Sequence, residues 1–120
     1  MSDDLKLSDF RKGETKVIKI DYGADTDITG WSFKVVFKKK SDQVHNDLEI
    51  ETTAGDEVLD DPMNGLAYLI IDSTTSLGLD VGKYFYSVKR IKPGSPQDIK
   101  TIAPPDDEYN ERITVYPYIG

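Results

Sequence analysis

The chain has 120 residues, enough for one domain that buries a core without a covalent staple. It contains no cysteine, which excludes disulfides, thiolate metal sites and cysteine nucleophiles. Fifteen basic residues against twenty-two acidic residues give a formal net charge of −7 at pH 7, and a negative surface disfavours nucleic acid and anionic membranes as partners.

The sequence gives no sign of export or membrane insertion. Its first residues, Met1–Asp4, are polar and acidic where a signal peptide would be basic and then apolar. No apolar stretch approaches the ~20 residues that a membrane-spanning helix needs. We therefore expect a soluble protein without an export signal.

Residues 1–9 are mostly polar, so ordering them would not offset their conformational entropy. We expect an N-terminal arm that is poorly ordered in the isolated protein. After this arm the apolar residues recur with a period of two, which predicts strands with one buried face. The clearest alternation runs from Trp31 to Phe37, and its odd-numbered residues are expected to face the core. Further strands are predicted at residues 17–20, 48–50, 84–88 and 113–115, and the apolar run 67–71 predicts a strand covered on both faces.

Turn signals separate these segments at short spacing. Asn64-Gly65 is the strongest, because both residues tolerate the positive φ of a tight hairpin. One helical turn is predicted at Ser73–Leu77, with Asp72 or Ser73 as its cap and Gly78 at its end. Short strands divided in this way favour a β-sandwich or a β-barrel. The core is expected to include Trp31, Phe33, Val35, Leu69, Ile71, Tyr86 and Val88.

The chain ends in an acidic loop at residues 104–111 and an apolar, aromatic tail at residues 116–120. Pro117 has no backbone N–H, so strand pairing is expected to weaken there. We expect Tyr116, Tyr118 and Ile119 to form an assembly contact, because exposed aromatic side chains suit a contact patch. The alternative is that the tail packs back onto its own domain.

No group of residues has the pattern of a catalytic site. His45 is the single histidine and lies in a polar stretch, where we expect a solvated residue and not a base. The serines lie in turns without the Gly-x-Ser-x-Gly pattern of a nucleophile. Two carboxylates across a cleft would suit a glycosidase, but nothing in the spacing selects a pair. We therefore expect that the protein is not an enzyme.

One segment has the opening rhythm of a calcium loop, with Asp25, Asp27, Thr29 and Gly30 at the first, third, fifth and sixth positions. The twelfth position, which should supply a bidentate carboxylate, is Val36. We interpret the segment as an Asx-type turn that opens the following strand. Other acidic clusters, and the basic run Lys38–Lys40, are interpreted as solvated loops and a strand end. No metal or cofactor is expected.

Four segments, in order, resemble a known family. They are Phe10-Arg11-Lys12-Gly13-Glu14-Thr15, Asp27-Ile28-Thr29-Gly30-Trp31-Ser32-Phe33, Asn64-Gly65 before Ala67-Tyr68-Leu69, and Gly82-Lys83-Tyr84-Phe85-Tyr86-Ser87-Val88. Their order and spacing are similar to the small immunoglobulin-like β-sandwich domains of tailed-phage virion proteins, such as the N-terminal domain of baseplate upper proteins. The resemblance covers roughly residues 8–115. It departs from the family at residues 104–111, which stand where the family has a short turn.

The resemblance implies an all-β fold, an immunoglobulin-like β-sandwich of about seven to nine mostly antiparallel strands, with residues 1–120 as a single domain. It implies a non-enzymatic structural component of the virion, assembled in the host cytoplasm and docked in multiple copies to other virion proteins. Whether these belong to the tail, the baseplate or the capsid stays open. The alternative is a carbohydrate- or receptor-binding module that presents aromatic residues such as Tyr22, Tyr109 or Tyr118 beside carboxylates.

Overall fold

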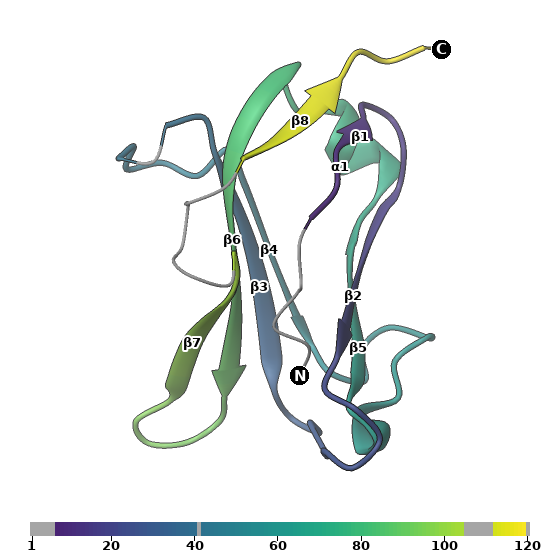
Figure 1. The fold of residues 1–120 in the computed structure, drawn as a ribbon, viewed down its shortest axis with the longest axis vertical. Coiled ribbons are helices and arrows are strands. Elements are labelled where there is room, and N and C mark those ends of the chain that lie inside the picture. The colour runs from purple at the N-terminus through teal and green to yellow at the C-terminus, as the bar shows by residue number, and fades with distance from the viewer. Residues whose placement is uncertain (1–6, 41, 105–111, 120) are drawn as a thin grey trace.

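The computed structural model describes residues 7–40, 42–104 and 112–119. Within these ranges the protein is all-β, as expected, with eight strands, one short α-helix and one 3-10 turn (Figure 1). The elements are β1 (Phe10–Arg11), β2 (Lys16–Asp21), β3 (Ser32–Lys38), β4 (Leu48–Thr53), η1 (Pro62–Asn64), β5 (Leu66–Ile71), α1 (Ser73–Leu77), β6 (Gly82–Lys92), β7 (Asp98–Ala103) and β8 (Arg112–Tyr116).

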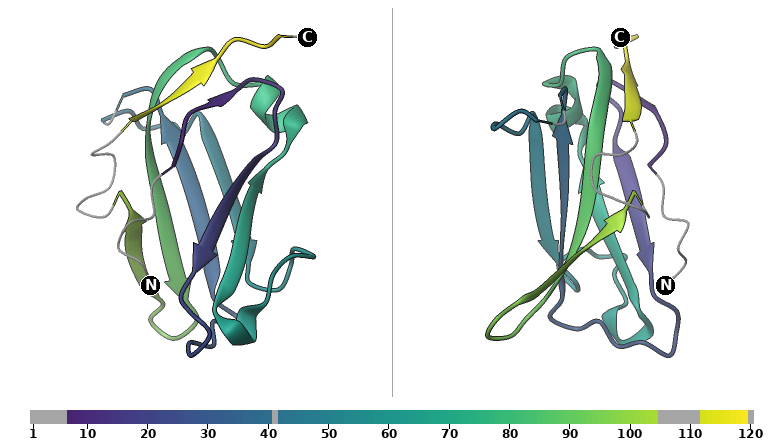
Figure 2. Two further views of the ribbon diagram at one scale, coloured as in Figure 1. Left: turned by 45° about the vertical axis from the view of Figure 1, so that its right-hand side comes forward. Right: turned by 60° about the vertical axis from the view of Figure 1, so that its left-hand side comes forward.

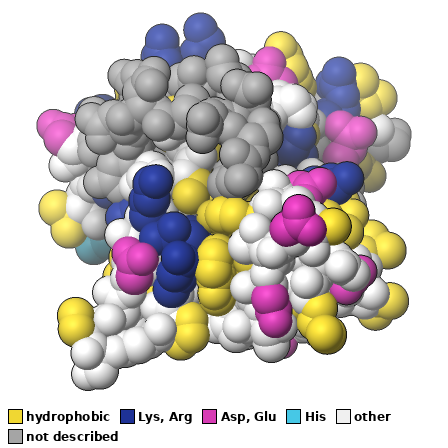
Figure 3. Space-filling view, turned by 60° about the horizontal axis from the view of Figure 1, so that its bottom comes forward, with side chains coloured by type: hydrophobic (Ala, Val, Ile, Leu, Met, Phe, Trp, Pro, Cys, Tyr) yellow, Lys and Arg dark blue, Asp and Glu magenta, His cyan; other side chains and the backbone are white. Residues whose placement is uncertain are grey.

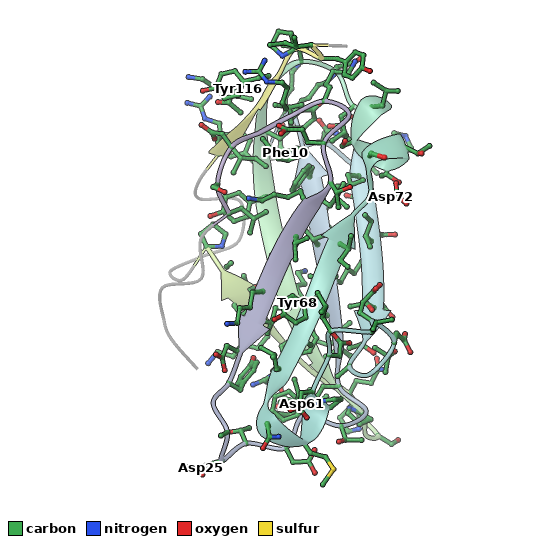
Figure 4. All side chains as sticks on the ribbon, turned by 90° about the vertical axis from the view of Figure 1, so that its right-hand side faces the viewer. Phe10, Asp25, Asp61, Tyr68, Asp72 and Tyr116 are labelled. Carbon is green, nitrogen blue, oxygen red and sulfur yellow. The ribbon has the colours of Figure 1, made fainter. Side chains whose placement is uncertain are left out.

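The strands form two sheets. The larger sheet has the order β1-β8-β6-β3-β4, and β2 pairs with β5 in the smaller one. β6 is long enough to pair with two strands on one edge, with β8 along Gly82–Phe85 and with β7 along Val88–Lys92. β1 and β8 run parallel, which makes the larger sheet mixed. Figures 2 and 4 show β2 and β5 as a separate layer against the larger sheet.

The core lies between the two layers and follows the period of two. Phe33, Val35 and Phe37 of β3 are fully buried, as the alternation predicts. Of the seven expected core residues, six are buried: Phe33, Val35, Leu69, Ile71, Tyr86 and Val88. The exception is Trp31, which is half-buried because it precedes the first paired residue of β3.

Two expectations about β5 need correction. Its burial alternates, with Ala67, Leu69 and Ile71 buried and the residues between them half-buried, because one face packs on the core and the other lies on the surface. The Asn64-Gly65 turn also closes no hairpin between paired strands. Asn64 ends η1, and the turn spans a single bridge between Asp61 and Leu66.

Position 65 requires a glycine, because the backbone of Gly23 passes close to it. Its φ is +77°, and a Cβ at this position would lie 2.3 Å from the carbonyl oxygen of Gly23. The Gly65 carbonyl accepts a hydrogen bond from Tyr22 N at 2.8 Å. The connection after β2 and the turn before β5 are therefore held together at one end of the molecule.

The predicted helical turn is confirmed as α1, with Asp72 accepting from Thr75 N and Gly78 at the C-cap. β1 and β7 were not predicted, because one is only two residues long and the other begins with exposed side chains. Of the predicted N-terminal arm, residues 1–6 lie outside the described residues, while Leu7 is buried in the core. Among the described residues no helix is long and apolar enough to cross a membrane.

Candidate docking surface

Backbone and side-chain hydrogen bonds hold the end of β8 against β1 and the residue that follows it. Lys12 N donates to the carbonyl oxygen of Tyr116 at 3.0 Å, and Arg11 Nη1 donates to the carbonyl oxygen of Pro117 at 2.9 Å. The Arg11 guanidinium also lies 5.8 Å from the centroid of the Tyr116 ring, within cation–π range. β8 ends at Tyr116, where Pro117 removes the next backbone donor.

Beyond Pro117, the Tyr118 ring lies over the turn between β1 and β2. Gly13 in this turn has φ +84°, and a Cβ there would come within 2.7 Å of the Tyr118 ring and 3.7 Å of a Leu77 methyl group. The ring therefore occupies space that only glycine leaves open. The tail is partly seated on its own domain, although Tyr118 remains 58% exposed.

The turn beneath Tyr118, between β1 and β2, is joined to α1 through the buried hydroxyl of Ser76. Ser76 Oγ accepts from Gly13 N at 3.0 Å and donates to the carbonyl oxygen of Glu14 at 2.7 Å. Asp72 caps the same helix, and the backbone N–H of Thr75 holds the pKa of its carboxyl below the usual value. The platform beneath the tail is therefore well connected to the body of the domain.

Five exposed apolar side chains come from α1, the turn before β6 and the C-terminal segment, which Figure 1 shows at one end of the molecule. We call them the tail patch: Leu77, Val81, Tyr116, Tyr118 and Ile119. Leu77 and Tyr118 share the space above Gly13. In the antiparallel pairing of β6 with β8, Gly82 lies opposite Val115. Val81 and Tyr116 are the next residue on each side of this pair. Tyr116, Tyr118 and Ile119 were predicted as a contact from sequence. Leu77 and Val81 were missed, because a single apolar residue in a turn carries no periodic signal.

A buried tyrosine and an ion pair lie next to Val81 of the tail patch. The buried Tyr84 hydroxyl donates to the carbonyl oxygen of Asp80 at 2.8 Å. Burial raises the pKa of Tyr84, with the nearby Lys39 charge opposing it. Lys39 also pairs with the Asp80 carboxylate and holds its pKa below the usual value. The basic run begins with Lys38, the last residue of β3, and Lys39 follows directly, so these two residues lie at a strand end as the sequence predicts.

A second aromatic group lies near the opposite end of β3. The Trp31 ring meets Tyr22 edge-on, with centroids 5.2 Å apart, and Lys92 Nζ lies 4.6 Å from the Trp31 centroid. The Arg90 guanidinium lies 5.8 Å from the same centroid and pairs with Asp98. Burial raises the pKa of the Tyr22 hydroxyl, and the Arg90 charge opposes this. Neither sequence spacing nor a motif pointed to this arrangement.

The residues that the sequence analysis considered for acid–base or calcium chemistry can be placed in the structure. His45 is exposed in the loop between β3 and β4. Asp27 accepts from the backbone N–H and hydroxyl of Thr29, so the calcium-like segment is an Asx-type turn. No described cluster of three or more His, Cys, Asp or Glu residues could hold a metal ion.

The aromatic residues expected for a glycan-binding module are not gathered. Tyr22 directly follows the last residue of β2. Tyr118 lies over Gly13, in the turn that precedes the first residue of β2, so the two tyrosines lie at opposite ends of this strand. The six residues of β2 separate them by about 20 Å. Tyr109 lies outside the described residues.

No protein-family model matches the chain, and neither the curated proteins nor the solved structures contain a match. Function is therefore inferred from the residues and their arrangement.

Proposed function

We propose that the protein is a non-enzymatic docking domain with an immunoglobulin-like fold, and that it serves as a structural component of a tailed-phage virion. The tail patch is its principal contact with other virion proteins. The observation that carries the docking role is the seating of an exposed aromatic tail on β1, the following turn and α1, which hydrogen bonds join to one another.

The strand order supports the immunoglobulin-like topology. In such domains strands C, F and G share one sheet, C′ extends it in the variable type, and B and E lie in the other. β3, β6 and β8 correspond to C, F and G, β4 takes the place of C′, and β2 and β5 take the places of B and E. Tyr84 near the start of β6 also matches the tyrosine corner of this fold, since its hydroxyl bonds to the backbone just upstream.

The chemistry of the tail patch supports docking to protein. Tyrosine provides a large, rigid contact area at low entropic cost, and buried aromatic anchors contribute much of the energy of protein interfaces. Ile119 is 75% exposed and therefore offers apolar surface to a partner. The virion as the setting rests on the sequence resemblance.

The test is a tail variant, Tyr118→Ser with Ile119→Ser, expressed during phage infection in place of the unmodified chain. We expect a melting temperature within about 2 °C of the unmodified protein and a loss of at least tenfold in incorporation into purified particles, measured by mass spectrometry. The matched control is Val17→Ser with Val44→Ser, which removes two exposed apolar side chains outside the tail patch, one on β2 and one in the loop between β3 and β4. Equal incorporation of both variants would reject the tail patch, and absence of the unmodified chain from particles would reject the virion role.

A further inference from the structure

The end of β6 and the start of β7 form a hairpin that stands away from the two layers. We call residues 89–101 the arm. Its strands pair from Lys89 with Thr101 to Lys92 with Asp98, and residues 93–100 are all exposed. Figure 2 (right) shows the arm projecting from the lower end of the molecule.

The arm is basic within an acidic chain. It contains four basic residues and one acidic residue, Asp98, while the whole chain has a net charge of −7. Arg90 and Lys100 face one another across the hairpin, and Lys92 lies two residues further along the same face. Arg90 is occupied by Asp98 and Trp31, whereas Lys100 is exposed and makes no ion pair with a described residue. Ile91 and Ile99 pair on the other face, and Ile99 is 55% exposed.

The same end of the molecule carries the opposite charge on its other side. Two segments contain seven acidic residues and no lysine or arginine: residues 21–30, which begin at the last residue of β2, and residues 54–65 between β4 and β5. We call them the acidic loops. They are joined by hydrogen bonds such as Ile28 N to the Pro62 carbonyl oxygen at 2.9 Å. Figure 4 shows Asp25 and Asp61 at this end, and Figure 3 shows basic groups left of centre with most acidic groups to the right.

The acidic loops also present apolar side chains. Val58, Leu59 and Met63 are well exposed, with Val58 fully so. The arm and the acidic loops therefore complement one another in charge, and both offer apolar surface. Within one molecule they point to different sides, so the complement of each is the corresponding surface of another copy.

We propose that the arm of one copy binds the acidic loops of a second copy, so that molecules associate side by side in a head-to-tail manner. Such a contact is heterologous and closes into a ring when the rotation between copies allows it. Charge would steer the encounter and fix the register, and Ile99 would pack against the apolar residues of the acidic loops. The proposal extends the proposed structural role by naming a neighbour, but it uses residues outside the tail patch.

Sedimentation of the purified full chain tests the proposal. At about 0.02 M salt, where charges act over roughly 20 Å, the weight-average mass should at least double from 13.5 kDa as concentration rises. At about 0.5 M salt, where the screening length is roughly 4 Å, it should return toward the monomer. A protein that stays monomeric at millimolar concentration in low salt overturns the proposal.

Two charge-reversal variants identify the surfaces. Lys92→Glu with Lys100→Glu changes the arm from four basic and one acidic residue to two basic and three acidic residues. The second variant combines Asp25→Lys, Asp56→Lys, Glu57→Lys and Asp61→Lys, which leaves three acidic residues against four lysines and makes the acidic loops net basic. Each variant alone should remain monomeric, because its arm and loops then repel. An equimolar mixture should associate again, since each arm now matches the loops of the other variant. Restored association also shows that both variants are folded, and a mixture that stays monomeric overturns the assignment.

Two controls distinguish this contact from association through a different surface. Lys40→Glu with Lys83→Glu makes the same charge change on exposed residues outside the arm and should leave association unchanged. The tail variant Tyr118→Ser with Ile119→Ser should also associate as the unmodified chain does. If only the tail variant loses association, the tail patch is the self-contact and the arm is not. If the unmodified chain is monomeric but its arm binds a poly-glutamate peptide, the partner is a different acidic protein and the second copy is rejected.

Discussion

The hydroxyl of Tyr84 donates a hydrogen bond to the carbonyl oxygen of Asp80, 2.8 Å away, across the turn that leads into β6. Tyr84 is otherwise buried, with its ring 5.9 Å from that of Phe37. The bond therefore ties the turn after α1 to a core side chain. It also fixes the backbone that presents Val81 to the tail patch.

Tyr84→Phe should lower the free energy of unfolding by about 1 kcal/mol, because it removes this hydrogen bond and leaves the packing of the ring unchanged. The melting temperature should fall by about 4 °C. Tyr68→Phe is the control, since no described residue bonds to its hydroxyl, and it should change stability by less than about 0.5 kcal/mol. Equal effects would mean that the Tyr84 bond contributes nothing to stability in solution.

Alkaline pH should destabilise the fold through two tyrosines. Burial raises the pKa of both Tyr22 and Tyr84 above the ordinary value of 10.0. Above about pH 10 the unfolded chain therefore loses protons that the folded chain keeps, so the free energy of unfolding falls as pH rises. This stabilisation is complete below about pH 10 and is lost as pH rises through the folded pKa values.

Urea unfolding between about pH 8 and pH 11 measures this slope. The double variant Tyr22→Phe with Tyr84→Phe should show a shallower slope, because neither ring can then lose a proton. If the slope is the same in the double variant, other groups cause the alkaline loss.

Trp31 and Phe33 differ in a way that alternation could not reveal. Both occupy odd-numbered positions of one pattern, yet Phe33 lies inside β3 and Trp31 lies one residue before it. Phe33→Ala should cost about 3–5 kcal/mol, the usual range for a fully buried ring. Trp31→Ala should cost less, about 1–3 kcal/mol, since part of its ring already contacts solvent. Denaturant midpoints that rank the two variants in the opposite order would contradict this assignment.

Local signals accounted for much of the fold. The period of two located β2, β3, β4, β6 and β8, a short apolar run located β5, and capping chemistry located α1. Pairing was harder, because the parallel contact of β1 with β8 joins Phe10 to Val115 and depends on the tertiary fold. The arm at residues 89–101 was also not predicted, because its polar residues carry no burial pattern. Only the register of β6 with β7 brings Arg90 opposite Lys100.

Calcium should not change stability. Asp27 already uses its carboxylate in the Asx-type turn with Thr29, and that bonding lowers its pKa. Melting temperatures in excess calcium and in chelator should agree within about 2 °C. Asp25→Asn with Asp27→Asn should be equally insensitive to calcium. A calcium-dependent rise that this variant abolishes would establish a site in the turn.

The seating of Tyr118 on Gly13 can be separated from the backbone strain of the turn. Gly13 and Gly23 have similar positive φ values, +84° and +91°, so alanine at either should cost about 1 kcal/mol through strain. A Cβ at Gly23 would meet nothing within 4 Å, whereas one at Gly13 would lie 2.7 Å from the Tyr118 ring.

Gly13→Ala should therefore displace Tyr118, and Gly23→Ala should not. The nuclear magnetic resonance signals of the Tyr118 ring provide the measurement, and the two variants should have similar melting temperatures because a terminal side chain can move aside at little cost. In particle incorporation, Gly13→Ala should resemble the tail variant more than Gly23→Ala does, since docking requires Tyr118 to be held in one position. If its ring signals are unmoved in Gly13→Ala, the tail does not rest on the turn in solution, and the platform cannot be what orients it for docking.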